Sequence, residues 1–237
     1  MNPYEKLLNR KRKWTPVQTT AGTCTPGTEE TIRRALALRH MELPVGDFIT
    51  DALAGEVPKL ARELLLSNVK DEENHDVALG FIASSYGTDA KAEAEAIRLR
   101  DAWVSHPDHT ITKAMVAERA IFFVLLPFFR AHGDPGMRTT SADISRDEQI
   151  HVATNSIVCR ELGLNISPSL DKLRLATINW VMQPLGSSPV RTLNKQTWLD
   201  SSDNLMYQGK APELSFTRSA RMPAFFEHDA RNLPQYA

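Results

Sequence analysis

Apolar residues recur with a helical period along most of the chain. From residue 57 to 86 they follow a spacing of about 3.6 residues, which predicts a helix with one buried face. Similar patterns predict further helices at about residues 28–53, 110–129, 141–162 and 168–184. The first of these should kink near Glu42, because Pro44 follows it closely and proline disturbs a continuous helix. We therefore expect an all-α protein.

The remaining segments indicate how the chain is organised. Residues 89–104 are rich in Ala, Glu and Arg, which favours a helix, and we expect them to form a long crossover. Residues 1–27 are predicted to be an N-terminal arm, whose basic run from residue 10 to 13 we interpret as solvated. Residues 28–186 would form the bundle with an extra C-terminal helix. Residues 187–237, rich in Pro and polar residues, are predicted to be an extended tail, packed on the bundle or partly mobile.

Two short sequences combine acidic residues with a histidine at helical spacing. One D-E-x-x-H motif contains Asp71, Glu72 and His75, and the second contains Asp147, Glu148 and His151. Residues three apart lie on the same face of a helix, so each motif can present a carboxylate oxygen and an imidazole nitrogen to one metal ion. A single motif is weak evidence, because E-x-x-H also occurs on many ordinary helix surfaces.

The two motifs belong to a longer repeat, which strengthens the case for a metal site. Each residue of the first motif recurs 76 positions later in the second, and Glu42 recurs in the same way as Glu118. In each half this single Glu precedes the motif Glu by 30 residues, a spacing that fits an antiparallel helical hairpin. The sequence therefore predicts six metal ligands, which are Glu42, Glu72, His75, Glu118, Glu148 and His151.

This ligand set resembles that of the ferritin-like di-iron carboxylate superfamily, which includes ribonucleotide reductase small subunits, bacterial multicomponent monooxygenases and aldehyde-deformylating oxygenases. The resemblance covers about residues 28–162 and implies a ferritin-like four-helix bundle. In the first two groups, the Asp before the motif Glu bonds the histidine of the opposite half. The resemblance thus implies that Asp71 bonds His151 and that Asp147 bonds His75, which would fix the orientation of each imidazole.

The chemistry of the ligands narrows the choice of metal. Four carboxylates with only two imidazoles favour iron or manganese over zinc or copper. We expect two iron ions, with two manganese ions or a mixed manganese–iron pair as alternatives. Glu118 lies among apolar residues, where an unpaired carboxylate would cost several kcal/mol, and a bound cation would remove that penalty.

The resemblance also limits the function. Leu79 stands four residues after His75, where ribonucleotide reductase small subunits usually carry an oxidisable tyrosine. Rubrerythrins add a cysteine-ligated iron that Cys24 and Cys159 cannot supply. We expect an oxygen-activating oxidase or oxygenase, with dioxygen and a small organic substrate as its partners. The alternatives are a reductase-like subunit without the usual tyrosine, and a non-catalytic metal-binding bundle. An electron-donor protein and a second copy of the chain, in a homodimer, are further candidate partners.

Composition excludes several other classes of protein. The net charge of −1 argues against nucleic acid as the main partner. Two cysteines without a C-x-x-C pair support neither a disulfide framework nor a thiolate zinc site. No apolar stretch reaches the roughly 18 residues that a membrane span needs, and the N-terminus lacks the apolar region of a secretory signal. We therefore expect a cytoplasmic protein without membrane association.

Overall fold

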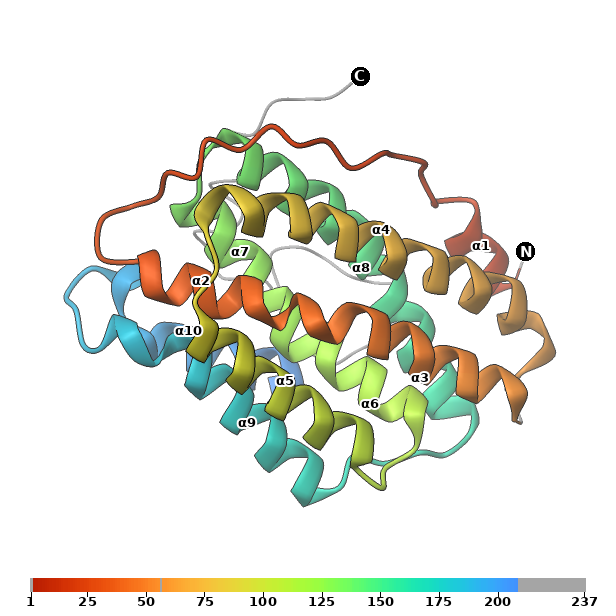
Figure 1. Ribbon diagram of the computed structural model, residues 1–237. Helices are drawn as coiled ribbons and strands as arrows, with labels where there is room; N and C mark the ends of the chain where they lie inside the picture. Colours follow the sequence, from red (N-terminus) through yellow and green to blue (C-terminus); the bar gives the residue numbers. More distant parts are fainter. Residues whose placement is uncertain (1, 56, 209–237) are drawn as a thin grey trace.

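Four helical runs form the centre of the protein in the computed structural model, which describes residues 2–55 and 57–208 (Figure 1). Over these residues the protein is an all-α helical bundle, which confirms the predicted fold class. The four runs are α2 (Glu29–Ala37), the 3₁₀ turn η1 (Leu38–Met41) and α3 (Glu42–Ala54); α4 (Arg62–Tyr86); α6 (Thr110–Ala117), the π-helical turn η3 (Glu118–Phe122) and α7 (Phe123–His132); and α8 (Pro135–Glu161).

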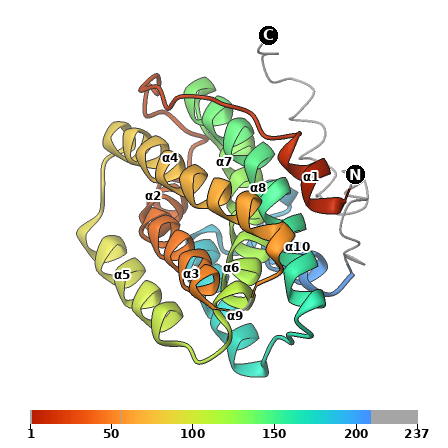
Figure 2. The same cartoon turned by 90° about the vertical axis from the view of Figure 1, so that its right-hand side faces the viewer.

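The helices pack in a closed ring around the core. α3 packs against α4 and α6, and α8 packs against α4, α6 and α7. The crossover helix α5 (Ala90–Ser105) lies outside this ring against α2, and α9 (Pro168–Met182) packs against both of them (Figures 1 and 2). Trp103 of α5 contacts α9, where its fully buried indole donates a hydrogen bond to Thr177 Oγ1 at 3.0 Å.

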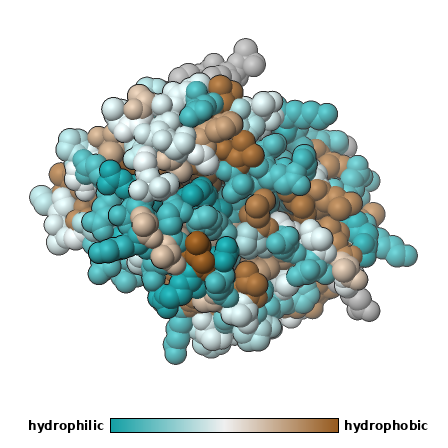
Figure 3. Space-filling view, in the orientation of Figure 1, coloured by the Kyte–Doolittle hydropathy of each residue, from teal (hydrophilic) through white to brown (hydrophobic). Residues whose placement is uncertain are grey.

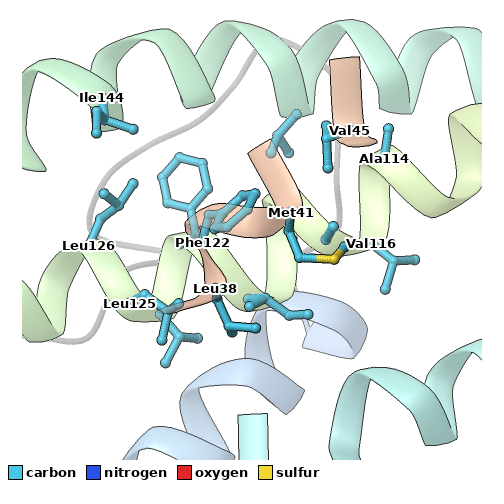
Figure 4. Packing of buried hydrophobic residues seen from close by; sticks show 14 of the residues in the cluster. Leu38, Met41, Val45, Ala114, Val116, Phe122, Leu125, Leu126 and Ile144 are labelled. Atoms are coloured by element: carbon cyan, nitrogen blue, oxygen red, sulfur yellow. The ribbon is translucent and has the colours of Figure 1, made fainter. Parts of the chain in front are cut away.

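The core fills the space between the runs with apolar side chains. Figure 4 shows part of it, with labelled side chains from the first run, the third run and α8 turned toward one another. The residues labelled there are Leu38, Met41, Val45, Ala114, Val116, Phe122, Leu125, Leu126 and Ile144. Leu38, Met41 and Val45 follow one another at three and four positions, so the first run turns one apolar side inward.

Two helical runs are interrupted where they pass the centre of the bundle. The first kinks at η1, just before Glu42, because Pro44 cannot donate the backbone hydrogen bond that a continuous helix would need there. The third contains the π-helical turn η3, which begins at Glu118 and which apolar periodicity does not predict. Single π turns inside helices occur frequently at functional sites.

The last helix of the ring begins earlier than the sequence pattern predicts. α8 starts at Pro135 instead of about residue 141, because Asp134 caps it and Pro135 fits the first position of a helix. The Asp134 side chain accepts a hydrogen bond from the Met137 N–H at 2.9 Å. Residues 135–140 therefore belong to the helix.

The N-terminal arm runs along the outside of α4 and α8 (Figure 1). It begins with α1 (Pro3–Leu8), which buries Tyr4 and Leu7 against the bundle. The interpretation of the basic run as solvated holds for its first and last residues and is wrong for Lys11 and Arg12. Both of these side chains pair with acidic residues on α4 and α8. Such distant pairings leave no periodic signal in the sequence.

The segment after α9 is partly helical. Residues 191–193 form a 3₁₀ turn, followed by α10 (Lys195–Asp203) and the π-helical turn η6 (Asn204–Gln208). Trp198 of α10 is fully buried, and α10 packs against α7, α9 and η3. The remainder of the predicted tail, residues 209–237, lies outside the described residues.

The surface is polar over most of the face shown in Figure 3, with small groups of apolar residues between polar ones. Among the described residues, no helix combines the length and the apolar character that crossing a membrane requires. Exposed apolar side chains of this scattered kind are normal on protein surfaces.

Candidate metal centre

The six predicted ligands meet in the interior of the bundle. Glu72 and His75 lie on α4, and Glu148 and His151 lie on α8. The remaining two glutamates lie where helical runs are interrupted, since Glu42 directly follows η1 and Glu118 begins η3. None of the six residues is more than 1% exposed.

One group of four residues surrounds the imidazole of His75. Its Nδ1 atom lies 3.4 Å from Glu148 Oε1, 3.5 Å from Glu72 Oε2 and 3.7 Å from Glu42 Oε2. One ligand atom from each of the four side chains lies within 4.8 Å of all the others. This separation is small enough for the four atoms to bind a single ion.

A second group surrounds the imidazole of His151. Its Nδ1 atom lies 2.8 Å from Glu72 Oε1, 3.7 Å from Glu118 Oε1 and 3.8 Å from Glu148 Oε2. Ligand atoms of Glu72, Glu118 and His151 also lie within 4.8 Å of one another. Glu72 and Glu148 thus face both histidines, whose ring centres are 5.6 Å apart.

An aspartate of the opposite half contacts the outer nitrogen of each histidine. His151 Nε2–H donates a hydrogen bond to Asp71 Oδ2 at 2.9 Å, and His75 Nε2 lies 3.4 Å from Asp147 Oδ2. The structure therefore contains both pairs that the resemblance implies. A proton held on Nε2 leaves the lone pair of Nδ1 directed at the glutamates, which is the arrangement that a metal-binding histidine needs.

Further residues around the ligands were not found by sequence reasoning. Trp14 Nε1–H donates to Asp147 Oδ2 at 2.6 Å, and Lys11 pairs with Asp71. Both belong to the N-terminal arm, where no helical spacing predicts their contacts. Asn155 Nδ2–H donates to Glu118 Oε2 at 2.7 Å. It lies four residues after a ligand histidine on the same helix face, a signal that could have identified it.

The cluster contains buried polar atoms that no described residue satisfies. Both carboxylate oxygens of Glu72 and of Glu148, Glu42 Oε2 and Glu118 Oε1 make no hydrogen bond, and neither do the two Nδ1 atoms, although His151 Nδ1 lies 2.8 Å from Glu72 Oε1. Burying such groups without partners is costly, and the cost is greatest for a charged carboxylate. All of these atoms are potential metal ligands, so the donor set fits bound cations.

Protonation of the cluster differs strongly from that of the same groups in water. Burial raises the pKa values of Glu42, Glu118 and Glu148. Burial acts in the same direction on Glu72, but the positive charge of His151 outweighs it and the pKa of Glu72 is lowered. Burial lowers the pKa of His151, yet its carboxylate neighbours raise it to about 10. Without metal, the imidazoles and part of the carboxylates therefore hold protons, which a bound cation would replace.

Neither a protein-family model nor a curated protein sequence matches this chain. The evidence for the site is therefore its geometry. An all-α bundle encloses a cluster of buried glutamates and histidines that can hold a metal ion and that fits a di-iron site.

Proposed function

We propose that the protein binds two iron ions in this cluster and uses them to activate dioxygen for the oxidation of a small organic substrate. The observation that carries the proposal is the convergence of four buried glutamates and two histidines whose inward atoms lack partners. Four carboxylates carry as much negative charge as two divalent cations carry positive charge. Two bound divalent ions would therefore balance the four buried carboxylates without any bound protons.

The positions of the side chains suggest which residue serves which ion. Glu42 and His75 would hold one ion, and Glu118 and His151 the other. Glu72 and Glu148 face both histidines and would be available to either ion. When bound, ferrous ions supply the electrons that reduce dioxygen.

The protein's own residues orient the ligands and exclude water. Asp71 and Asp147 direct each Nδ1 atom inward, as described above. Leu79, Ile121 and Phe122 follow ligand residues by three or four positions and are buried, so bulk water is kept from that side of the cluster. The π-helical turn that begins at Glu118 supports a functional rather than a purely structural role for this region.

No observation favours the reductase-like alternative. The nearest tyrosine on α4 is Tyr86, which lies 11 residues after His75 and thus about 16 Å further along the helix axis. Its hydroxyl donates to the Thr23 carbonyl and accepts from the Asp134 N–H, so it serves in the packing of the N-terminal arm. The non-catalytic alternative differs from the proposal only in its reaction with oxygen.

The proposal is tested by anaerobic loading with ferrous iron, followed by metal counting and rapid mixing with dioxygen. We expect two irons per chain, oxygen consumption and a transient optical absorption. Glu118→Gln should abolish the absorption. Glu93→Gln should keep it, because Glu93 is a partly buried carboxylate bonded to Arg39, outside the cluster.

The two ways in which this experiment can fail are distinct. If the wild-type protein retains no stoichiometric metal, the metal centre itself is refuted. If it binds two irons that do not react with dioxygen, the oxygenase reading is refuted and a metal-stabilised or metal-storing bundle remains.

A further inference from the structure

The N-terminal arm places a different kind of side chain beside each of the two Asp–His pairs. Lys11 forms an ion pair with Asp71, and its Nζ atom lies 3.5 Å from His151 Nε2. On the other pair, the neutral indole of Trp14 donates to Asp147 at 2.6 Å. One histidine thus has a cation behind its aspartate, and the other has an uncharged donor.

We propose that Lys11 is a positioning residue that makes the two metal positions unequal, weakening metal binding at Glu118 and His151 relative to Glu42 and His75. This inference rests on the proposed dinuclear centre. It adds that one ion binds first, and that the position beside His151 is the weaker one.

The charge of Lys11 acts on a metal ion in two ways. It neutralises Asp71, so this aspartate can share less negative charge with the imidazole to which it is bonded. It also repels any cation bound to the other nitrogen of the same ring. The side chain of Lys11 is only 10% exposed, so water screens the repulsion incompletely.

The aspartate of the opposite position is paired with an uncharged donor. Asp147 receives a hydrogen bond from the neutral Trp14, whose ring also stacks near His75 at a centroid distance of 6.2 Å. The neighbouring cation of the arm, Arg12, is engaged elsewhere, because its guanidinium bonds Asp143 at 2.9 Å. Asp147 is therefore neutralised less than Asp71, which pairs with a cation.

One further difference acts in the same direction. Glu118 accepts a hydrogen bond from Asn155, which reduces the negative charge available to an ion. The weaker position therefore has a partly neutralised glutamate and a histidine backed by a cation.

A purely structural role for Lys11 would have a different signature. If Lys11 only anchored the arm, its loss would disturb Trp14 as well, and both metal positions would weaken together. If its charge makes the positions unequal, removing the charge should strengthen one position and leave the other nearly unchanged. The two explanations therefore predict changes of opposite sign in the metal affinity of the weaker position.

The experiment is a titration with manganese(II) alone, in which the electron paramagnetic resonance signal of the free ion gives two stepwise affinities. We expect two separate steps in the wild type. Lys11→Met should tighten the weaker step by about tenfold and change the tighter one by less than about twofold. Lys11→Arg should preserve the wild-type separation. Arg12→Met, which removes a neighbouring cation of the arm, should preserve it too.

Two further variants of the intact chain show which metal position each binding step belongs to. Glu118→Gln should abolish the weaker step and Glu42→Gln the tighter one. The inference is overturned if this assignment is reversed, a result that does not depend on whether Lys11→Met folds. It is also overturned if Lys11→Met weakens the second step, leaves it unchanged or shifts both steps equally.

Failure of the inference can be told apart from failure of the proposed function. Two equal manganese steps in the wild type would overturn only the inequality, since the dinuclear centre would still be present. A wild-type protein that binds no manganese and no iron would overturn the metal centre and the inference together.

Discussion

Replacing Glu118 by glutamine should have opposite effects on stability with and without metal. Glu118 is fully buried, and only its Oε2 atom has a partner among the described residues, the amide of Asn155. Burial raises its pKa, which means that the charged form is disfavoured in the metal-free protein. Glutamine has nearly the same shape and keeps an oxygen for the Asn155 amide. It carries no charge, so it cannot replace the carboxylate as a ligand.

The size of each effect follows from the burial of this carboxylate. Burying a charged carboxylate without a cation costs more than burying a neutral amide, so the variant should be about 1–2 kcal/mol more stable than the wild type without metal. With free metal at about 100 times the Kd, each bound ion stabilises the wild type by about 2.7 kcal/mol. Because the variant loses one ion, the wild type should then be the more stable protein by about 1–2 kcal/mol.

The assay is urea unfolding followed by circular dichroism, once with a chelator and once with manganese(II). A change of 1 kcal/mol corresponds to about 2–4 °C in Tm for a chain of this size, so thermal scans should show the same reversal. Glu93→Gln is the matched control, because it removes a carboxylate bonded to Arg39 and should destabilise the protein equally in both conditions. The reasoning is refuted if Glu118→Gln is less stable than the wild type in the chelator.

Two other predictions concern pH and the π-helical turn. Burial lowers the pKa of His151, but its carboxylate neighbours raise it to about 10, above its ordinary value of about 6.5. The stability that protonated His151 contributes to the metal-free protein is therefore complete below pH about 6.5 and is lost as pH rises toward 10. A free energy of unfolding that stays constant from pH 7 to 9 in a chelator would contradict this prediction. Ser202 donates a hydrogen bond to the Ala120 carbonyl of η3 at 2.6 Å and accepts one from Arg174 Nη1 at 2.6 Å, so Ser202→Ala should lower the unfolding free energy by about 2 kcal/mol. Ser201 bonds only within its own helix, and Ser201→Ala should cost less than half of that; equal costs would show that neither contact of Ser202 contributes.

The repeat in the sequence identifies the residues of the buried cluster because it reflects helix geometry directly. A glutamate and a histidine three positions apart must share a helix face, whatever the rest of the chain does. The spacing of 76 residues then pairs Glu42 with Glu118, and these two glutamates do lie with the motifs in the structure. Predicting this part of the site requires only local rules of helix geometry and the assumption that the two halves are folded alike.

Other features could not be read from the sequence, because they depend on distant contacts or on small energy differences. Lys11 and Trp14 come from an arm without periodicity, and their positions are set by two aspartates more than 50 residues away. The π turn at Glu118 needs only a shift of backbone hydrogen bonds by one residue, which leaves the apolar pattern of its helix unchanged. The burial of α10 depends on Trp198, in a segment whose composition resembles a tail.

The extent of the internal repeat separates the residues that would bind metal from those that would make the two ions different. The ligands and the two aspartates behind the histidines all recur at the same spacing. The residues that contact these side chains do not recur. Asn155, which bonds Glu118, corresponds to Leu79 in the first half. The arm, which has no counterpart in the second half, brings a cation to one side and an indole to the other. A bundle that needed only to hold two equivalent ions would require no such difference. The residues that do not recur are therefore where substitutions should change the properties of one ion without removing the pair.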